Sequence, residues 1–327
     1  GNTPIMSAVK KAELVLHNSQ TTKTYKGLAG DDAFRDSMRE LVLGGSVPAG
    51  RVATIQTPGG TGAIRQLYEA IKKINGEATL WLSDPTWPSH VGIARHMGMK
   101  MRSYSYFDGA NSTVDFNAMM NDLAGVQPQD VVMLHGCCHN PTGANLDAAQ
   151  WDAVTDLILA KGAIPFVDIA YQGFGDGLDA DAAGLRAMAA RVPEMLIAAS
   201  CSKNFGLYRD RVGCAMVICE NTDQHEVVSR NLAVLNRLNY SFAPDHGAAL
   251  VAIILGDKDL RAEWETELGE MRDTMLTIRQ NLADELRRQC NTDRFDFIAS
   301  HRGMFSRLGL EKDSVEAVSY THLTLPT

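Results

Sequence analysis

Short apolar runs alternate with amphipathic stretches along most of this chain. Seven strand-like runs predict strands, at residues 53–56, 79–83, 100–106, 131–135, 164–168, 196–200 and 213–219. Stretches with helical spacing, such as 62–74 and 148–160, lie between most of them. The alternation predicts an α/β fold with a mostly parallel seven-stranded sheet that helices cover on both faces. Residues 201–211 are too few for a helical crossover, so the last strand should run antiparallel to its neighbour.

One long amphipathic helix is predicted over residues 258–288. Its apolar side chains recur at helical spacing: Leu260, Trp264, Leu268, Met271, Met275, Ile278 and Leu282. Two later apolar runs, 295–298 and 303–305, predict strands of a smaller second unit. The chain therefore divides into a large domain at 1–270, an incomplete small α+β domain at 271–316, and an atypical tail at 317–327 that is a candidate non-native segment.

Composition narrows the classes of function. The 327 residues include 31 Lys and Arg against 39 Asp and Glu, a net charge of −8, so we expect neither nucleic acid nor an anionic membrane as a partner. No apolar run approaches the roughly 18 residues of a membrane span, and no signal peptide is visible at the first residues. Six cysteines without a CxxC pair predict reduced, buried thiols in a cytoplasmic protein.

Three consecutive residues, Cys137, Cys138 and His139, raise the question of a metal site. Adjacent residues of an extended segment point to opposite faces, so these side chains should not converge on one ion. We therefore predict no metal.

The segment around Lys203 carries the strongest chemical signal. The apolar run 195–199 leads into it, and Ser200, Ser202 and Arg211 flank the lysine. A lysine in such surroundings can lose its proton and form a Schiff base with a carbonyl, while hydroxyls and an arginine can bind a phosphate. This combination indicates pyridoxal 5'-phosphate (PLP).

Other strand ends carry residues that suit the same ligand. Gly60 and Thr61 lie in a glycine-rich turn that opens a helix, where free backbone N–H groups bind phosphate. Asp168 ends a buried strand and could keep a pyridine nitrogen protonated. At roughly 4 Å and an effective dielectric of about 20, such a pair interacts by about 4 kcal/mol. Each motif also has a purely structural interpretation. Gly60 and Thr61 would then only form a glycine-rich turn, and Asp168 would only cap the turn that follows its strand.

Aromatic and amide side chains complete the set. Trp87 lies in a loop with two prolines, where its indole could stack on a flat ring or simply pack. Asn140 precedes a proline in a turn, and Tyr171 follows Asp168 by three residues, so both could reach the same ligand. Agreement among five separated segments is a stronger signal than any one motif.

These segments resemble the aspartate and aromatic amino acid aminotransferases, PLP enzymes of fold type I. The resemblance runs to about Leu310 and rests on the stretches 57–63, 87–90, 135–143, 168–174 and 202–208. It implies transfer of an amino group from aspartate or an aromatic amino acid to a 2-oxo acid such as 2-oxoglutarate. The motifs leave the choice between aspartate and aromatic donors open.

The resemblance also implies residue roles. Lys203 would bind PLP covalently and carry a proton, and Asp168 would pair with the ring nitrogen. Asn140 and Tyr171 would bond the ring oxygen, and Trp87 would stack on the ring. The phosphate would be held by Gly60, Thr61, Ser200 and Arg211.

Two further matches imply a homodimer with shared active sites. Tyr25 matches a tyrosine that reaches the phosphate of the partner subunit, and Arg237 matches a partner arginine that binds the distal carboxylate of dicarboxylic substrates. The family's arginine for the substrate α-carboxylate and its amino-terminal closing segment have no match. We therefore expect the intact parent to be active, and the chain as given to bind PLP but to transaminate weakly or not at all.

Three alternatives stay open at this point. Residues 200–203 spell S-x-x-K, the motif of serine acyl enzymes, but its companions S-D-N and K-T-G are absent. A PLP lyase, racemase or decarboxylase would use the same cofactor chemistry. The chain could also be a PLP-binding protein without transaminase activity.

Overall fold

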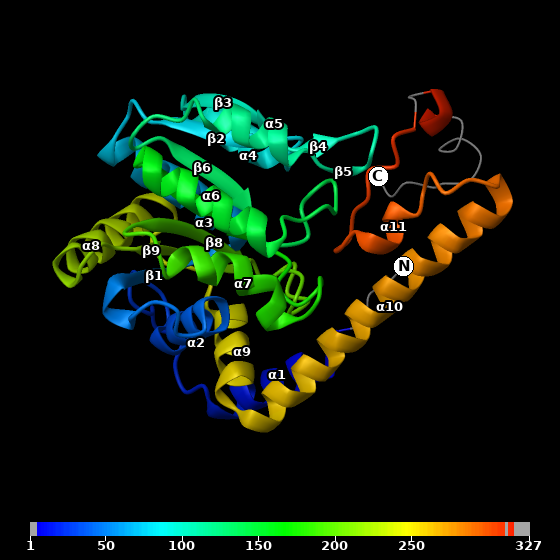
Figure 1. Cartoon of the computed structure of the whole chain (residues 1–327). Helices are drawn as coiled ribbons and strands as arrows, with labels where there is room; N and C mark the ends of the chain where they lie inside the picture. Colours follow the sequence, from blue (N-terminus) through cyan, green and yellow to red (C-terminus); the bar gives the residue numbers. More distant parts are fainter. Residues whose placement is uncertain (1–4, 311–312, 317–327) are drawn as a thin grey trace.

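A seven-stranded sheet forms the centre of the protein in a computed structural model that describes residues 5–310 and 313–316 (Figure 1). Its strands are β1 (Val52–Pro58), β2 (Thr79–Asp84), β3 (Lys100–Ser105), β6 (Val131–His135), β7 (Ile164–Ile169), β8 (Met195–Ser200) and β9 (Val212–Ile218). They lie in the order β1-β9-β8-β7-β6-β2-β3, and only β9 runs antiparallel to its neighbours. Every predicted strand of the sheet is confirmed, as is the reversed last strand.

Helices cover both faces of this sheet. One face packs against α3 (Gly59–Ile74), α4 (Pro88–His96) and α8 (Thr222–Asn239). The other face packs against α1 (Ser7–Ser19), α2 (Asp32–Leu43), α5 (Phe116–Leu123), α6 (Ala148–Lys161), α7 (Leu178–Ala189) and α9 (Asp245–Gly256). A short 3-10 helix, Ala49–Arg51, precedes β1. The strands β4 (Phe107–Asp108) and β5 (Thr113–Val114) pair as a separate two-stranded antiparallel hairpin.

Burial on both faces explains the continuous apolar runs in the sequence. In β8 the side chains of Ile197 and Ala198 point to opposite faces, and both are fully buried. A central strand between two helical layers therefore needs apolar residues at every position, rather than at every second one.

The long helix α10 (Lys258–Cys290) confirms the predicted helix and runs diagonally away from the sheet (Figure 1). Its first half packs on α1 and α9, where Trp264 and Leu268 are buried. Its end contacts α11 (Phe297–Ser300). The predicted domain boundary at residue 270 lies within this helix, and the tail 317–327 lies outside the described residues.

The two strands predicted for the second unit are wrong. Residues 297–300 form the short helix α11, and residues 303–305 follow it without regular structure. Short apolar runs fit a buried helical turn as well as a strand. Here the carbonyl groups of Ile298, Gly303 and Phe305 accept hydrogen bonds from the Arg279 side chain instead of from a neighbouring strand.

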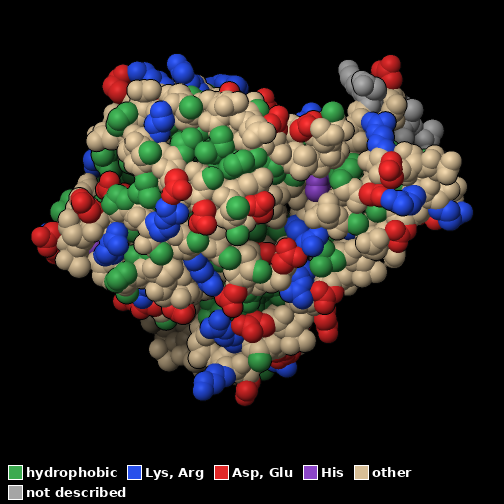
Figure 2. Space-filling view, viewed as in Figure 1, with side chains coloured by type: hydrophobic (Ala, Val, Ile, Leu, Met, Phe, Trp, Pro, Cys, Tyr) green, Lys and Arg blue, Asp and Glu red, His purple; other side chains and the backbone are tan. Residues whose placement is uncertain are grey.

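The surface mixes charges of both signs, as Figure 2 shows for the visible face. None of the helices in the described residues combines the length and the apolar character that crossing a bilayer requires.

Candidate active site

A cavity of about 370 Å³ lies where the carboxyl ends of the parallel strands meet. Nine predicted residues line it: Gly60, Thr61, Trp87, Asn140, Asp168, Tyr171, Ser200, Lys203 and Arg211. Asp168 and Ser200 lie at the carboxyl ends of β7 and β8, and the others lie in the segments that follow β1, β2, β6, β7 and β8. Parallel strands bring their carboxyl ends to the same sheet edge, which gathers residues that are far apart in the sequence.

Lys203 lies in the turn between β8 and β9, half-buried beside Tyr171. Its Nζ is 4.7 Å from the centroid of the tyrosine ring. Burial lowers the pKa of the lysine, the Asp168 carboxylate partly opposes that effect, and the Arg211 charge adds to it. A larger fraction of the amine is therefore neutral, and available as a nucleophile, than on an exposed lysine.

Asp168 is held as a carboxylate by a buried histidine, His90. The Nε2 atom of His90 lies 3.0 Å from the Oδ2 of Asp168, and the imidazole is fully buried. Burial raises the pKa of Asp168, but the hydrogen bond and charge of His90, with smaller contributions from His135 and Lys203, lower it below its usual value. The aspartate is therefore ionised at neutral pH, as an anion that pairs with a protonated ring nitrogen must be.

The chain of contacts continues behind Asp168. The Thr86 hydroxyl lies 2.9 Å from His90 Nδ1 and 3.1 Å from His135 Nε2. Burial, followed by repulsion from His90, lowers the pKa of His135 to about 3, so this imidazole is neutral. Sequence reasoning matched the segment that contains His90 but assigned no role to the histidine, because hydrophobic periodicity does not mark a polar side chain that supports another one.

Asn140 and Tyr171 meet at the cavity wall. The Asn140 Nδ2 donates to the Tyr171 hydroxyl at 3.5 Å. Burial and the Asp168 charge raise the pKa of Tyr171 to about 12. The phenol therefore stays protonated near neutral pH and can donate a hydrogen bond to an anionic oxygen.

A phosphate-sized cradle lies at the start of α3. A Cβ atom added to Gly59 would lie 2.5 Å from Arg211 Nη2, and one added to Gly60 would lie 3.0 Å from Ser200 Cβ. Glycine therefore lets the backbone approach the arginine and serine closely. Among the described residues, Arg211 Nη1 donates to neutral oxygens of Ser202 and Tyr208, at 3.4 and 3.2 Å. Hydroxyls, a guanidinium and a helix start fit a phosphate monoester, so the residues present fit PLP.

Two predicted site residues lie outside the cavity. Tyr25 is 82% exposed, and its ring stacks on Phe242 at a centroid distance of 4.4 Å. Arg237 is exposed in the last turn of α8. Sequence reasoning gave both residues roles toward a partner subunit, and neither lines the cavity of its own chain.

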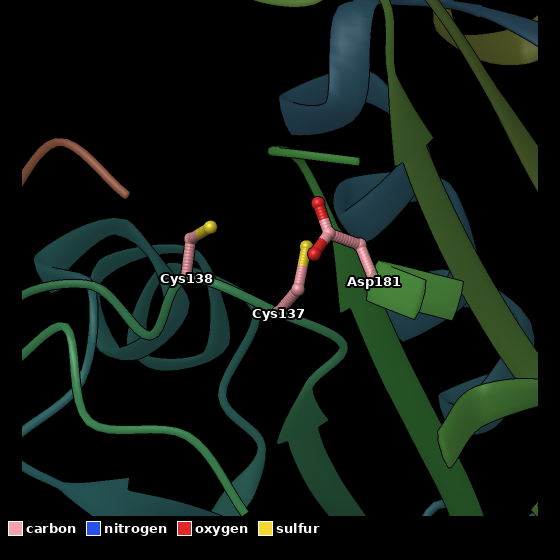
Figure 3. Close-up of side chains that lie close together, drawn as sticks. All are labelled: Cys137, Cys138 and Asp181. Atoms are coloured by element: carbon pink, nitrogen blue, oxygen red, sulfur yellow. The ribbon is translucent and has the colours of Figure 1, made fainter. Parts of the chain in front are cut away.

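Three buried side chains lie side by side next to the cavity: Cys137, Cys138 and Asp181 (Figure 3). Their ligand atoms lie within 4.8 Å of one another, so the thiols of Cys137 and Cys138 lie close together although the two residues are adjacent in the sequence. The segment is not a strand, because Cys138 has a φ of 49°. His139 does point elsewhere, and stacks on Tyr106 at 3.9 Å.

Asp181 is already satisfied by the backbone. Its carboxylate accepts hydrogen bonds from the N–H groups of Gly173, Gly175 and Asp176 at 2.8, 2.9 and 2.8 Å. Three such bonds account for a buried carboxylate in the absence of a cation. We interpret the cluster as part of the structure that supports the cavity wall.

Known proteins match the chain along nearly its whole length. The family described as aminotransferase class I and II matches residues 1–324. An aromatic-amino-acid aminotransferase of Paracoccus denitrificans is 49% identical over 97% of this chain and 81% of its own length. An aspartate aminotransferase of Escherichia coli (strain K12) is 42% identical over 96% of this chain and 80% of its own length.

Solved structures match equally well. An aromatic amino acid aminotransferase with 3-indolebutyric acid superposes with a TM-score of 0.97 at 49% identity, covering 98% of this chain and 82% of that one. An aromatic-amino-acid aminotransferase from Burkholderia pseudomallei, covalently bound to pyridoxal phosphate, gives a TM-score of 0.95 at 38% identity, covering 97% and 80%.

Proposed function

Because this chain belongs to the class I and II aminotransferases and is a PLP-dependent enzyme of that family, we propose that its amino donors are aspartate or aromatic amino acids. The acceptor is a 2-oxo acid such as 2-oxoglutarate. The observation that carries the proposal is the cavity in which Lys203, Asp168 and the phosphate cradle face one space. Family membership favours neither an acyl-enzyme serine nor a PLP lyase or decarboxylase.

PLP supplies an electron sink that lets a bound amino acid lose its α-proton. Lys203 provides the attachment point and, when released, moves the proton, which its lowered pKa favours. Asp168, held ionised by His90, keeps the ring nitrogen protonated. Asn140 and Tyr171 would donate hydrogen bonds to the ring oxygen, and Trp87, which also lines the cavity, would stack on the ring.

The phosphate of PLP would be bound by the cradle at the start of α3. Its residues are Gly60, Thr61, Ser200 and Arg211. Backbone N–H groups at the start of α3 and the Arg211 guanidinium neutralise the phosphate and fix the ring's position. Fixing the ring in this way keeps Lys203 within reach of the reacting atoms.

A homodimer would complete each site. In such a dimer Tyr25 would reach the phosphate and Arg237 the substrate bound to the partner subunit; neither residue lines its own cavity. Apolar side chains on the same helix as Arg237 are exposed, with Val227 at 60% and Leu238 at 72%. A partner subunit that contacts this helix would cover these side chains.

Domain organisation and location follow from the same proposal. The large domain ends near residue 270, and α10 continues into the small domain at 271–316. The cytoplasm is the expected compartment, because all six cysteines are free and five are buried.

A donor panel tests the proposal. Aspartate, tyrosine and phenylalanine are each offered with 2-oxoglutarate to the full-length gene product, and glutamate formation is measured. We expect glutamate from at least one donor class, and Arg237→Ala should weaken aspartate turnover more than phenylalanine turnover, because only aspartate has a distal carboxylate. Release of carbon dioxide or ammonia without glutamate would contradict the proposal.

A further inference from the structure

A buried arginine on α10 has no acidic partner among the described residues. Arg279 is 7% exposed and uses its whole guanidinium on neutral oxygens. Nε donates to the Gly303 carbonyl at 3.0 Å, and Nη1 donates to the Ile298 carbonyl at 3.1 Å and to the Ser306 hydroxyl at 2.7 Å. Nη2 donates to the carbonyls of Gly303 and Phe305. Burying a charge in this way is costly unless its hydrogen bonds are satisfied.

The segment that Arg279 holds forms part of the cavity wall. Phe305 lines the cavity, and its ring meets that of Tyr171 edge to face at a centroid distance of 6.2 Å. The same segment packs against the loop that carries Asn140. The Arg302 N–H donates to the Gly143 carbonyl at 2.9 Å, and a Cβ on Gly143 would lie 2.4 Å from the Phe305 oxygen.

Residues 303–306 have no strand or helix hydrogen bonds of their own. Their position therefore depends on the guanidinium on one side and on the close contact with Gly143 on the other. The planar guanidinium of an arginine has five N–H donors and can bind several carbonyl groups at fixed angles, whereas the ammonium group of a lysine cannot.

We propose that Arg279 is a positioning residue for the reaction: it fixes the Gly303–Ser306 segment so that Phe305 bounds the space that the amino-acid substrate occupies. The inference rests on the proposed transaminase function. The phosphate cradle is carried by other elements, at the start of α3 and after β8. We call the hydrogen bonds from Arg279 to this segment the Arg279 clamp. Loss of the clamp should therefore affect substrate binding more than PLP binding.

Arg279→Lys tests the proposal in the PLP-loaded enzyme, with Arg287→Lys as the matched control. Arg287 lies on the same helix but is exposed and pairs with Asp296. We expect Arg279→Lys to raise the KM of the donor amino acid by roughly fivefold or more, with kcat changed less than about twofold. The PLP dissociation constant should stay near the wild-type value, and the control should change none of the three.

A second readout does not depend on activity. Exchange of the Arg302 amide hydrogen, which bonds the Gly143 carbonyl next to this segment, should become faster in Arg279→Lys and stay unchanged in Arg287→Lys. If the wild-type enzyme lacked transaminase activity, the proposed function would fail, while this exchange experiment would still decide whether the clamp exists.

A double-mutant cycle with Phe305→Ala tests whether Arg279 acts through the phenylalanine. The two KM effects should be less than additive, because either change removes the same wall. Three outcomes would each overturn the proposal. They are additive KM effects of the two changes, an unchanged KM in a folded Arg279→Lys variant, and a loss of PLP affinity as large as the rise in KM.

Ser306→Ala covers the case in which Arg279→Lys does not fold. This change removes one hydrogen bond of the five and should raise KM in the same direction by a smaller factor. Wild-type KM together with wild-type exchange of the Arg302 amide hydrogen in Ser306→Ala would equally overturn it.

Discussion

At the scale of single residues, the site depends on two lowered pKa values, that of Asp168 and that of Lys203. Burial raises the pKa of Asp168, yet the hydrogen bond and the charge of His90 lower it below its usual value. Burial also disfavours the charge on Lys203. One anion to hold a ring proton and one amine that loses its proton readily are the two groups that PLP chemistry requires.

Replacing Lys203 tests the residue on which the site depends. Lys203→Ala should remove the covalent link to PLP and reduce kcat by about 10²–10⁴-fold or more, because the proton carrier is lost. Borohydride reduction followed by peptide mass mapping should locate the PLP adduct at residue 203 in the wild type. An adduct at another lysine, or wild-type turnover in the variant, would contradict the assignment.

At the scale of elements, the junction between β1 and α3 forms the phosphate cradle. Gly59 has a φ of 70°, a conformation that favours glycine, and it lies against the Arg211 guanidinium. The strand delivers the turn to the sheet edge, and the helix that follows presents its free N–H groups there. The cradle is therefore a property of the strand–turn–helix unit.

Gly59→Ala should weaken PLP binding by roughly tenfold or more, because the new methyl group meets Arg211 and the residue pays about 1–2 kcal/mol of backbone strain. Gly45→Ala is the matched control, since Gly45 has a φ of 76° but a Cβ there meets nothing within 4 Å. Titration of both variants with PLP, followed by absorbance, separates the clash from the strain. Equal PLP affinities would show that the close approach is unimportant.

At the scale of the whole molecule, one chain gathers nine of the predicted site residues in its cavity, but Tyr25 and Arg237 lie outside it. In a symmetric dimer, each of these residues would serve the site of the other subunit. The number of complete sites then depends on how the two chains are paired.

Mixed dimers test this arrangement. Lys203→Ala and Arg237→Ala chains, each weakly active with aspartate, are unfolded together and refolded at equal amounts. Shared sites predict recovery of roughly one quarter of wild-type aspartate activity, because half of the dimers are hybrids with one intact site. Sedimentation should confirm that the refolded chains are dimers. If their aspartate activity does not exceed the mean of the two parent variants, Lys203 and Arg237 serve the site of the same chain.

The sequence by itself determined the sheet, the helices at 62–74, 148–160 and 258–288, and nine of the residues that line the cavity. Apolar strands buried on both faces and glycine-rich turns leave local patterns, and strand ends place chemistry at a known edge. Only the tertiary structure decided the support of those residues by His90 and Thr86, the convergence of Cys137 with Cys138, and the Arg279 clamp that replaces the strands predicted at 295–298 and 303–305. These depend on contacts between segments far apart in the chain. Such contacts leave no periodic signal in the sequence. Each involves a polar side chain or a short segment, and the packing of the folded chain determines which residues it contacts.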